Sequence, residues 1–166
     1  MKLTGFTLLC ALILTLNLAL NTVGRAKQGP KWKQISVISY TRSDVERLMG
    51  KSNDNGYLVY YPLEEGSLHI EYSAGPCNPN QDGWDVPKWT VIEVTYTPFK
   101  APPKFSELNP DFSKFKKELA GPCTPGIFSY INEEEGIRYT VEPDGTVMDI
   151  VYFPSSRYSK IRCNSQ

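Results

Sequence analysis

The sequence predicts an α+β fold of two tandem helix–β-hairpin–strand units with antiparallel sheet, and three observations support this prediction. The segment 56–66 recurs without a gap as 126–136, and both copies have terminal glycines, a central tyrosine and a Glu-Glu-Gly turn. A Thr-Val-apolar-acid-apolar-x-Tyr-x-Pro segment at 90–98 recurs at 146–154. Apolar residues with helical spacing precede each hairpin, so helices should pack on the sheet.

Residues 1–26 have the features of a cleaved signal peptide. Lys2 supplies a short positive region, an apolar run spans 6–20, and Gly24 and Ala26 stand at the −3 and −1 positions of a cleavage site. The run is shorter than the ~20 residues that cross a bilayer. We therefore expect an exported protein, periplasmic or extracellular, with no integral membrane span after cleavage.

Composition and cysteine content narrow the class of protein. Acidic and basic residues balance at 18 each, so no charge excess predicts a nucleic-acid partner. Three cysteines follow the signal peptide, and an oxidising compartment favours a disulfide between two of them. We favour Cys77–Cys163, which would tie the C-terminal tail to the end of a strand. The rival pairing is Cys77–Cys123.

The first unit, 27–98, begins with an alternating segment at 32–40 that predicts a leading strand. A short amphipathic helix should follow. Ser43 and Glu46 have the spacing of a capping box, and Gly50 suits the C-terminal cap.

Two hairpin strands are predicted next, at 57–61 and 67–72. Side chains in the second strand alternate between the two faces of the sheet. Leu68, Ile70 and Tyr72 should face inward, and Ser67, His69 and Glu71 outward. The alternation lapses over 73–88 and resumes in a third strand that begins near Thr90.

A proline-rich linker is predicted at 99–110, before the second unit at 111–166. Asn109 can cap a second helix that Gly121 ends, with its apolar face formed by Phe112, Phe115 and Leu119. Strands are then expected at 127–131, 137–141 and 146–154. The second unit has only a short turn where the first has 73–88, so this loop is an insertion in one copy.

The first helix resembles a known family of bacterial envelope proteins. The spacing Thr41-x-x-x-Val45-x-x-x-x-Gly50 is similar to that of the small outer-membrane assembly proteins of the BamE, SmpA and OmlA type. The tandem order of elements also resembles the β-lactamase inhibitor protein fold, and the whole chain looks similar to exported bacterial proteins. Ser52 departs from the first family, in which a proline often follows the glycine, and no lipidation cysteine follows the signal peptide. The resemblance implies an envelope interaction module rather than a catalyst.

Catalytic and metal-binding residues are sparse in the sequence. His69 is the only histidine, and a small secreted hydrolase would have to use it or the acidic turns at 64–65 and 133–135. A solvated strand face and solvated turns explain these residues equally well, so we expect no enzymatic activity. Asn78–Gly83 matches only the first half of a calcium loop, because Trp89 stands where a bidentate glutamate is needed. We expect no metal and no cofactor.

The inserted loop is the best candidate for a binding site, because the fold does not require it. Trp84, Val86, Pro87 and Trp89 are typical anchors of a protein-binding patch. Alternatively, both tryptophans fold back onto the sheet and Cys77 fixes them there. The sequence favours an exported, non-catalytic protein-binding or inhibitor-type module whose partner is another protein, bound through 73–89. The alternative is the hydrolase.

Overall fold

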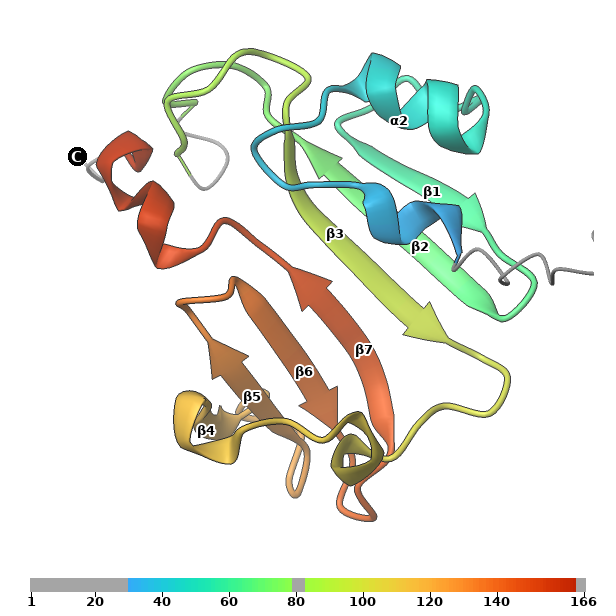
Figure 1. Ribbon diagram of the computed structural model, residues 1–166, viewed down its shortest axis with the longest axis vertical. Helices are drawn as coiled ribbons and strands as arrows, with labels where there is room; N and C mark the ends of the chain where they lie inside the picture. The colour runs from blue at the N-terminus through green and yellow to red at the C-terminus, as the bar shows by residue number, and fades with distance from the viewer. Residues whose placement is uncertain (1–29, 79–82, 164–166) are drawn as a thin grey trace, which may run out of the picture. The chain divides into compact units, whose positions relative to one another are not determined.

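The computed structural model describes residues 30–78 and 83–163, and its framework is a seven-stranded antiparallel sheet (Figure 1). The strand order is β1-β2-β3-β7-β6-β5-β4. The strands are β1 (Leu58–Pro62), β2 (Gly66–Tyr72), β3 (Val91–Pro98), β4 (Lys116–Leu119), β5 (Phe128–Asn132), β6 (Ile137–Val141) and β7 (Val147–Tyr152). An α+β fold with antiparallel sheet is therefore confirmed. The expected signal peptide lies outside the described residues.

The predicted hairpins and third strands form twice, as β1–β2–β3 and as β5–β6–β7. β3 pairs with β7 at the centre of the sheet, where Val94 lies opposite Tyr152 and Tyr96 opposite Ile150. The strand part of the repeat is thus present in both halves. The helix part is not, so the complete tandem unit is not confirmed.

The glycines that end the two repeated segments have the same physical role. A Cβ on Gly66 would lie 2.4 Å from the carbonyl oxygen of Thr97, and one on Gly136 would lie 2.2 Å from that of Phe153. Gly136 also has a φ of +68°, which L side chains rarely adopt. Both hairpins approach the neighbouring backbone so closely that no side chain fits.

The first helix forms as α2 (Arg42–Met49), but its cap differs from the prediction. Thr41 is the N-cap residue, and its backbone N–H donates to the carboxylate of Asp44 at 2.9 Å. The capping box is therefore Thr41 with Asp44, not Ser43 with Glu46. The hydroxyl of Thr41 also donates to this carboxylate, at 2.6 Å. The side-chain and backbone hydrogen bonds from Thr41 lower the pKa of Asp44 from 3.8 to about 2.

The leading strand predicted at 32–40 is wrong. The chain instead forms the 3-10 helix η1 (Lys31–Gln34) and then a turn in which Ile38 has a φ of +68°. Trp32 is buried and stacks on Tyr96, with ring centroids 4.6 Å apart. Packing of this indole on the sheet outweighs the alternating pattern that suggested a strand.

The second helix, predicted from Asn109 to Gly121, is also wrong. This region contains η2 (Phe105–Leu108), η3 (Phe112–Lys114) and the edge strand β4, which pairs with β5. Phe105 is buried and contacts the rings of Phe112 and Phe115, so the segment predicted as a linker supplies a core residue. Pairing with β5 satisfies the backbone groups of 116–119 that face this strand, without a helix.

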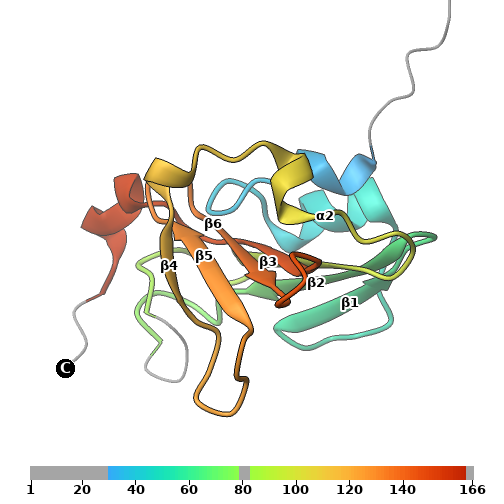
Figure 2. The same cartoon turned by 90° about the horizontal axis from the view of Figure 1, so that it is seen from below.

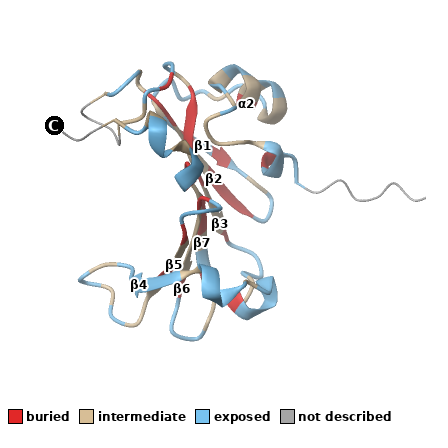
Figure 3. Ribbon diagram, turned by 60° about the vertical axis from the view of Figure 1, so that its left-hand side comes forward, coloured by how far each residue is buried: buried red, intermediate tan, exposed pale blue. Residues whose placement is uncertain are grey.

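The hydrophobic core lies on one face of the sheet. Leu68, Ile70 and Tyr72 are fully buried there with Trp32 and Val45, and Phe105 lies in a second cluster with Val141 and Val147. Figure 2 shows α2 and the 3-10 helices η1, η2 and η3 on this side of the sheet. Figure 3 shows that buried residues concentrate in the central strands and that β4 is exposed. α2, η1, η2 and η3 leave the opposite side of the sheet uncovered, and we call it the open face.

Candidate binding groove

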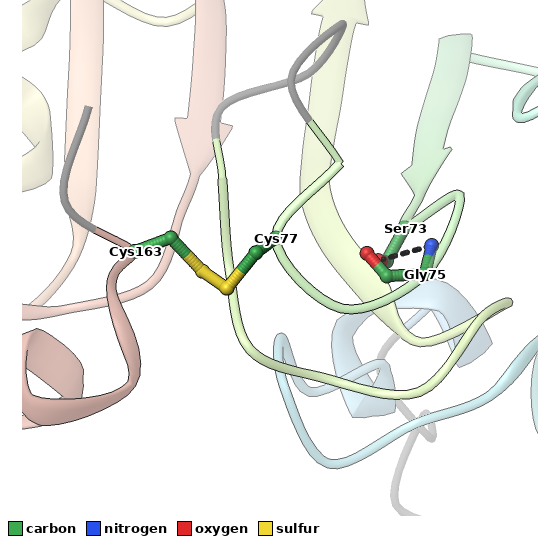
Figure 4. Close-up of a disulfide and its surroundings, with 4 residues drawn as sticks. All are labelled: Ser73, Gly75, Cys77 and Cys163. Carbon is green, nitrogen blue, oxygen red and sulfur yellow. Dashed lines mark hydrogen bonds between the residues drawn. A yellow bond between two sulfur atoms is a disulfide. The ribbon is translucent and has the colours of Figure 1, made fainter. Parts of the chain in front are cut away.

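A disulfide joins the inserted loop to the C-terminal segment. Cys77 and Cys163 form the predicted bond, and Cys123 is a free, exposed thiol, so the rival pairing is wrong (Figure 4). The backbone N–H of Cys163 donates to Gly83 at 2.8 Å, and Trp84 forms a β-bridge with Arg162. A structural disulfide is consistent with export to an oxidising compartment.

These two segments border a groove on the open face of the sheet, with a volume of about 420 Å³. We call this cavity the groove. Its lining comes from the loop, from four strands and from the chain around η4 (Ser156–Ile161). The lining residues are Trp84, Glu71, Ile92, Glu93, Ile131, Glu133, Arg138, Phe153, Pro154, Ser155, Ser156, Ser159 and Arg162.

A second hollow of about 350 Å³ lies on the open face, and Arg138 lines both this hollow and the groove. Thr95, Thr140, Asp149 and Val151 are among the residues that line the second hollow. We call the two hollows together the trough. Asp149 lines the second hollow and Ser155 lines the groove, and the six residues between them place them at most ~20 Å apart at about 3.3 Å per residue.

The trough carries an excess of negative charge. Five carboxylates line it against two guanidinium groups, and one of the five, that of Glu118, is ion-paired with Lys116 at 3.1 Å, which leaves a balance of two negative charges. The carboxylates belong to Glu71, Glu93, Glu118, Glu133 and Asp149, and the guanidinium groups to Arg138 and Arg162.

Two buried polar atoms of trough residues have no hydrogen-bond partner. They are the Oγ atom of Ser155, a residue only 5% exposed, and the Oδ1 atom of Asp149. Buried polar atoms are nearly always hydrogen-bonded in folded proteins. Both atoms have less than 1 Å² of exposed surface, so the protein encloses them and does not present them to the trough.

The four predicted binding residues do not form one patch. Trp84 lines the groove, with the guanidinium group of Arg162 5.7 Å from its ring centroid. Trp89 instead stacks on Tyr57, with centroids 4.8 Å apart, and packs against the core. Val86 is 5% exposed and so offers little contact surface. Pro87 is exposed but does not line the groove.

The residues that a hydrolase would need do not assemble. His69 packs edge-on against Tyr60 on the adjacent strand, with centroids 5.1 Å apart. Within 30–78 and 83–163 its side chain makes no hydrogen bond or ion pair, and His69 lines neither hollow. The acidic turns are exposed, and no described group of acids, histidines or cysteines could hold a metal ion. Among the described residues, no helix is long and apolar enough to cross a membrane.

Comparison of the sequence with models of known protein families gives no match, and no curated protein matches it. The structure is similar to the crystal structure of a DUF4309 family protein (YjgB) from Bacillus subtilis, with a TM-score of 0.52 and 13% sequence identity. The likeness covers 81% of this chain and 92% of the other. At this identity it shows a shared fold alone, and it points to neither of the two families that the first helix and the tandem order resemble.

Proposed function

We propose that the protein is an exported, non-catalytic binding or inhibitor-type module that holds an extended segment of another protein in the trough. The observation that carries the proposal is that the groove, which Trp84 lines, and the second hollow, which Asp149 lines, share Arg138 in their linings. An extended segment of about six residues is ~20 Å long, which is enough to reach from residues of the groove to residues of the second hollow. The groove alone has the volume of a small-molecule site, but its extension into the second hollow favours a polymer.

The walls of the groove support the same proposal. Trp84 is a large aromatic anchor of the kind that dominates binding energy at protein interfaces. The disulfide fixes the loop that carries it, which reduces the entropy lost on binding. The isolated position of His69 supports the non-catalytic part of the proposal, and the disulfide supports export to the periplasm or the extracellular medium.

Selection from a phage-displayed library of random linear peptides tests the proposal. Peptides selected on the wild-type protein should bind at least about tenfold more weakly to Trp84→Ala, the effect of losing ~1.4 kcal/mol. Phe99→Ala is the matched control, because Phe99 is 62% exposed and lines neither hollow. Peptides that bind Trp84→Ala as tightly as the wild type, or a library that yields no binder, would contradict the proposal.

A further inference from the structure

We propose that Arg138 holds the main chain of the bound segment by donating hydrogen bonds to its carbonyl oxygens. This inference rests on the proposed function and adds the chemistry by which the segment is recognised. Among the described residues, Arg138 alone lines both hollows, so a segment that occupies both of them passes over it. Main chain is the part of a segment that is present at this point whatever its sequence.

The register of the sheet leaves Arg138 without an acidic neighbour directly across either adjacent strand. Arg138 is half-buried and lies opposite Ile131 on β5 and opposite Val151 on β7. Directly opposite residues are the closest side-chain neighbours in an antiparallel pair, and both are apolar here. Within 30–78 and 83–163 the guanidinium group makes no hydrogen bond, ion pair or ring contact. Its five N–H donors are therefore free for an occupant of the trough.

The charges around Arg138 favour an uncharged acceptor over an acidic side chain. Asp149 lies diagonally across from Arg138 in the register of β6 and β7. Glu133 also lines the trough, which as a whole has a balance of two negative charges. This charge repels an incoming carboxylate, whereas a carbonyl oxygen accepts hydrogen bonds from a guanidinium group without carrying a net charge. Main-chain carbonyls are the acceptors that fit both conditions.

The apolar neighbours of Arg138 support the same assignment. Ile131 lines the groove and Val151 lines the second hollow, one on each side of Arg138. Side chains next to the anchored carbonyl thus meet apolar surface in both hollows, which favours uncharged residues at these positions. A hydrogen bond from a charged donor is also stronger beside apolar surface than in water.

The test is a thioamide scan of one peptide selected on the wild-type protein. Each member of the scan replaces one main-chain carbonyl oxygen with sulfur, a weaker acceptor, and keeps every side chain and every N–H. Affinities are measured by calorimetry. We expect sulfur at one position, or at two adjacent positions, to weaken binding to the wild type about fivefold. Sulfur at the same positions should not change binding to Arg138→Leu.

Variants of the protein assign the effect to the guanidinium group. Arg138→Leu should bind the parent peptide at least about tenfold more weakly, because hydrogen bonds from charged groups are the strong ones. Arg138→Lys keeps the positive charge but not the planar fork, so it should recover only part of the affinity. Arg157→Leu is the matched control and should bind as the wild type does, because Arg157 is exposed and lines neither hollow. Without peptide, Arg138→Leu should unfold at no lower temperature than the wild type, because position 138 lies between two apolar residues.

The outcomes separate this inference from the proposed function. Unchanged binding to Arg138→Leu, with binding lost in Trp84→Ala, would overturn the inference and leave the proposed function standing. Thioamide effects of equal size on the wild type and on Arg138→Leu would assign the carbonyls to another donor and overturn it too. So would a glutamate at the sensitive position that tightens binding to the wild type but not to Arg138→Leu, because the ligand of Arg138 would then be a carboxylate. If no peptide binds, the inference and the proposed function both fail.

Discussion

Removal of the Cys77–Cys163 disulfide should weaken the whole domain. The bond joins residues separated by 86 positions, which is most of the described chain. In the chain-entropy treatment a loop of this length restricts the unfolded state by about 4–5 kcal/mol, although measured values are more often 2–4 kcal/mol. A domain of this size has only ~5–15 kcal/mol of stability in total. We therefore expect the double variant Cys77→Ser/Cys163→Ser to lose about 2–5 kcal/mol in its free energy of unfolding.

The loss should also have a local component at the groove. Without the disulfide, the backbone of the C-terminal segment is held to the inserted loop by the Trp84–Arg162 bridge, whose two hydrogen bonds run from Cys163 to Gly83 and from Asp85 to Ile161. Backbone contacts this few are expected to open readily. Amide protons of this segment should thus exchange faster in the double variant than those of the central strands.

Urea unfolding followed by tryptophan fluorescence measures the global effect. Cys123→Ser is the control and should unfold as the wild type does, because its thiol is exposed and unpaired. The double variant should also show a steeper dependence on urea, since its unfolded chain is less compact. A loss below about 1 kcal/mol would refute the loop-entropy reasoning.

Three further substitutions test the fold. Gly136→Ala should cost more than the ~1–2 kcal/mol expected of Gly145→Ala in thermal unfolding, because both have positive φ but only the first places a Cβ 2.2 Å from a backbone oxygen; equal costs would contradict the close approach. Leu68→Ala should cost about 3 kcal/mol and Leu119→Ala less than ~0.5, because the first is fully buried and the second 59% exposed; similar costs in urea unfolding would contradict the assigned burial. Asp44 has a lowered pKa, so its contribution to stability is present above pH 3.8 and is lost as the pH falls through about 2; the stability difference between wild type and Asp44→Asn should shrink over that range in acid titrations, and a constant difference would contradict the cap.

The strands could be predicted from the sequence because their signals are local. The alternation of Leu68, Ile70 and Tyr72 reflects a sheet with one face in the core, and the structure buries all three. The recurrence of Gly66 as Gly136 predicts two hairpins, and in both of them the glycine closely approaches a neighbouring backbone. These patterns arise from residues close together in the chain, so they predict the strands without knowledge of the tertiary packing.

The second helix was mispredicted because tertiary contacts outweigh its local signal. Phe112 and Phe115 have helical spacing, but both contact Phe105, a residue that a proline-rich sequence concealed as a linker. The chain after Phe115 then pairs with β5 as an edge strand. Tertiary packing overrides propensity in such a segment.

The groove was only partly predictable. The sequence singled out Trp84, because an insertion absent from one copy of a repeat indicates function. Arg138, Ser155 and Glu93 were missed, since they lie in separate segments that only the strand order brings together. One available signal was the outward position of Arg138 between the inward residues Ile137 and Tyr139.

The most direct test of the central claim, that the trough is the binding site, is hydrogen–deuterium exchange with and without a peptide selected on the wild-type protein. We predict that the peptide slows exchange in residues 83–86 and 153–163, which form the walls of the groove, and leaves the β1–β2 turn unchanged. Protection confined to the helix-covered face of the sheet, or no protection at saturating peptide, would contradict the claim.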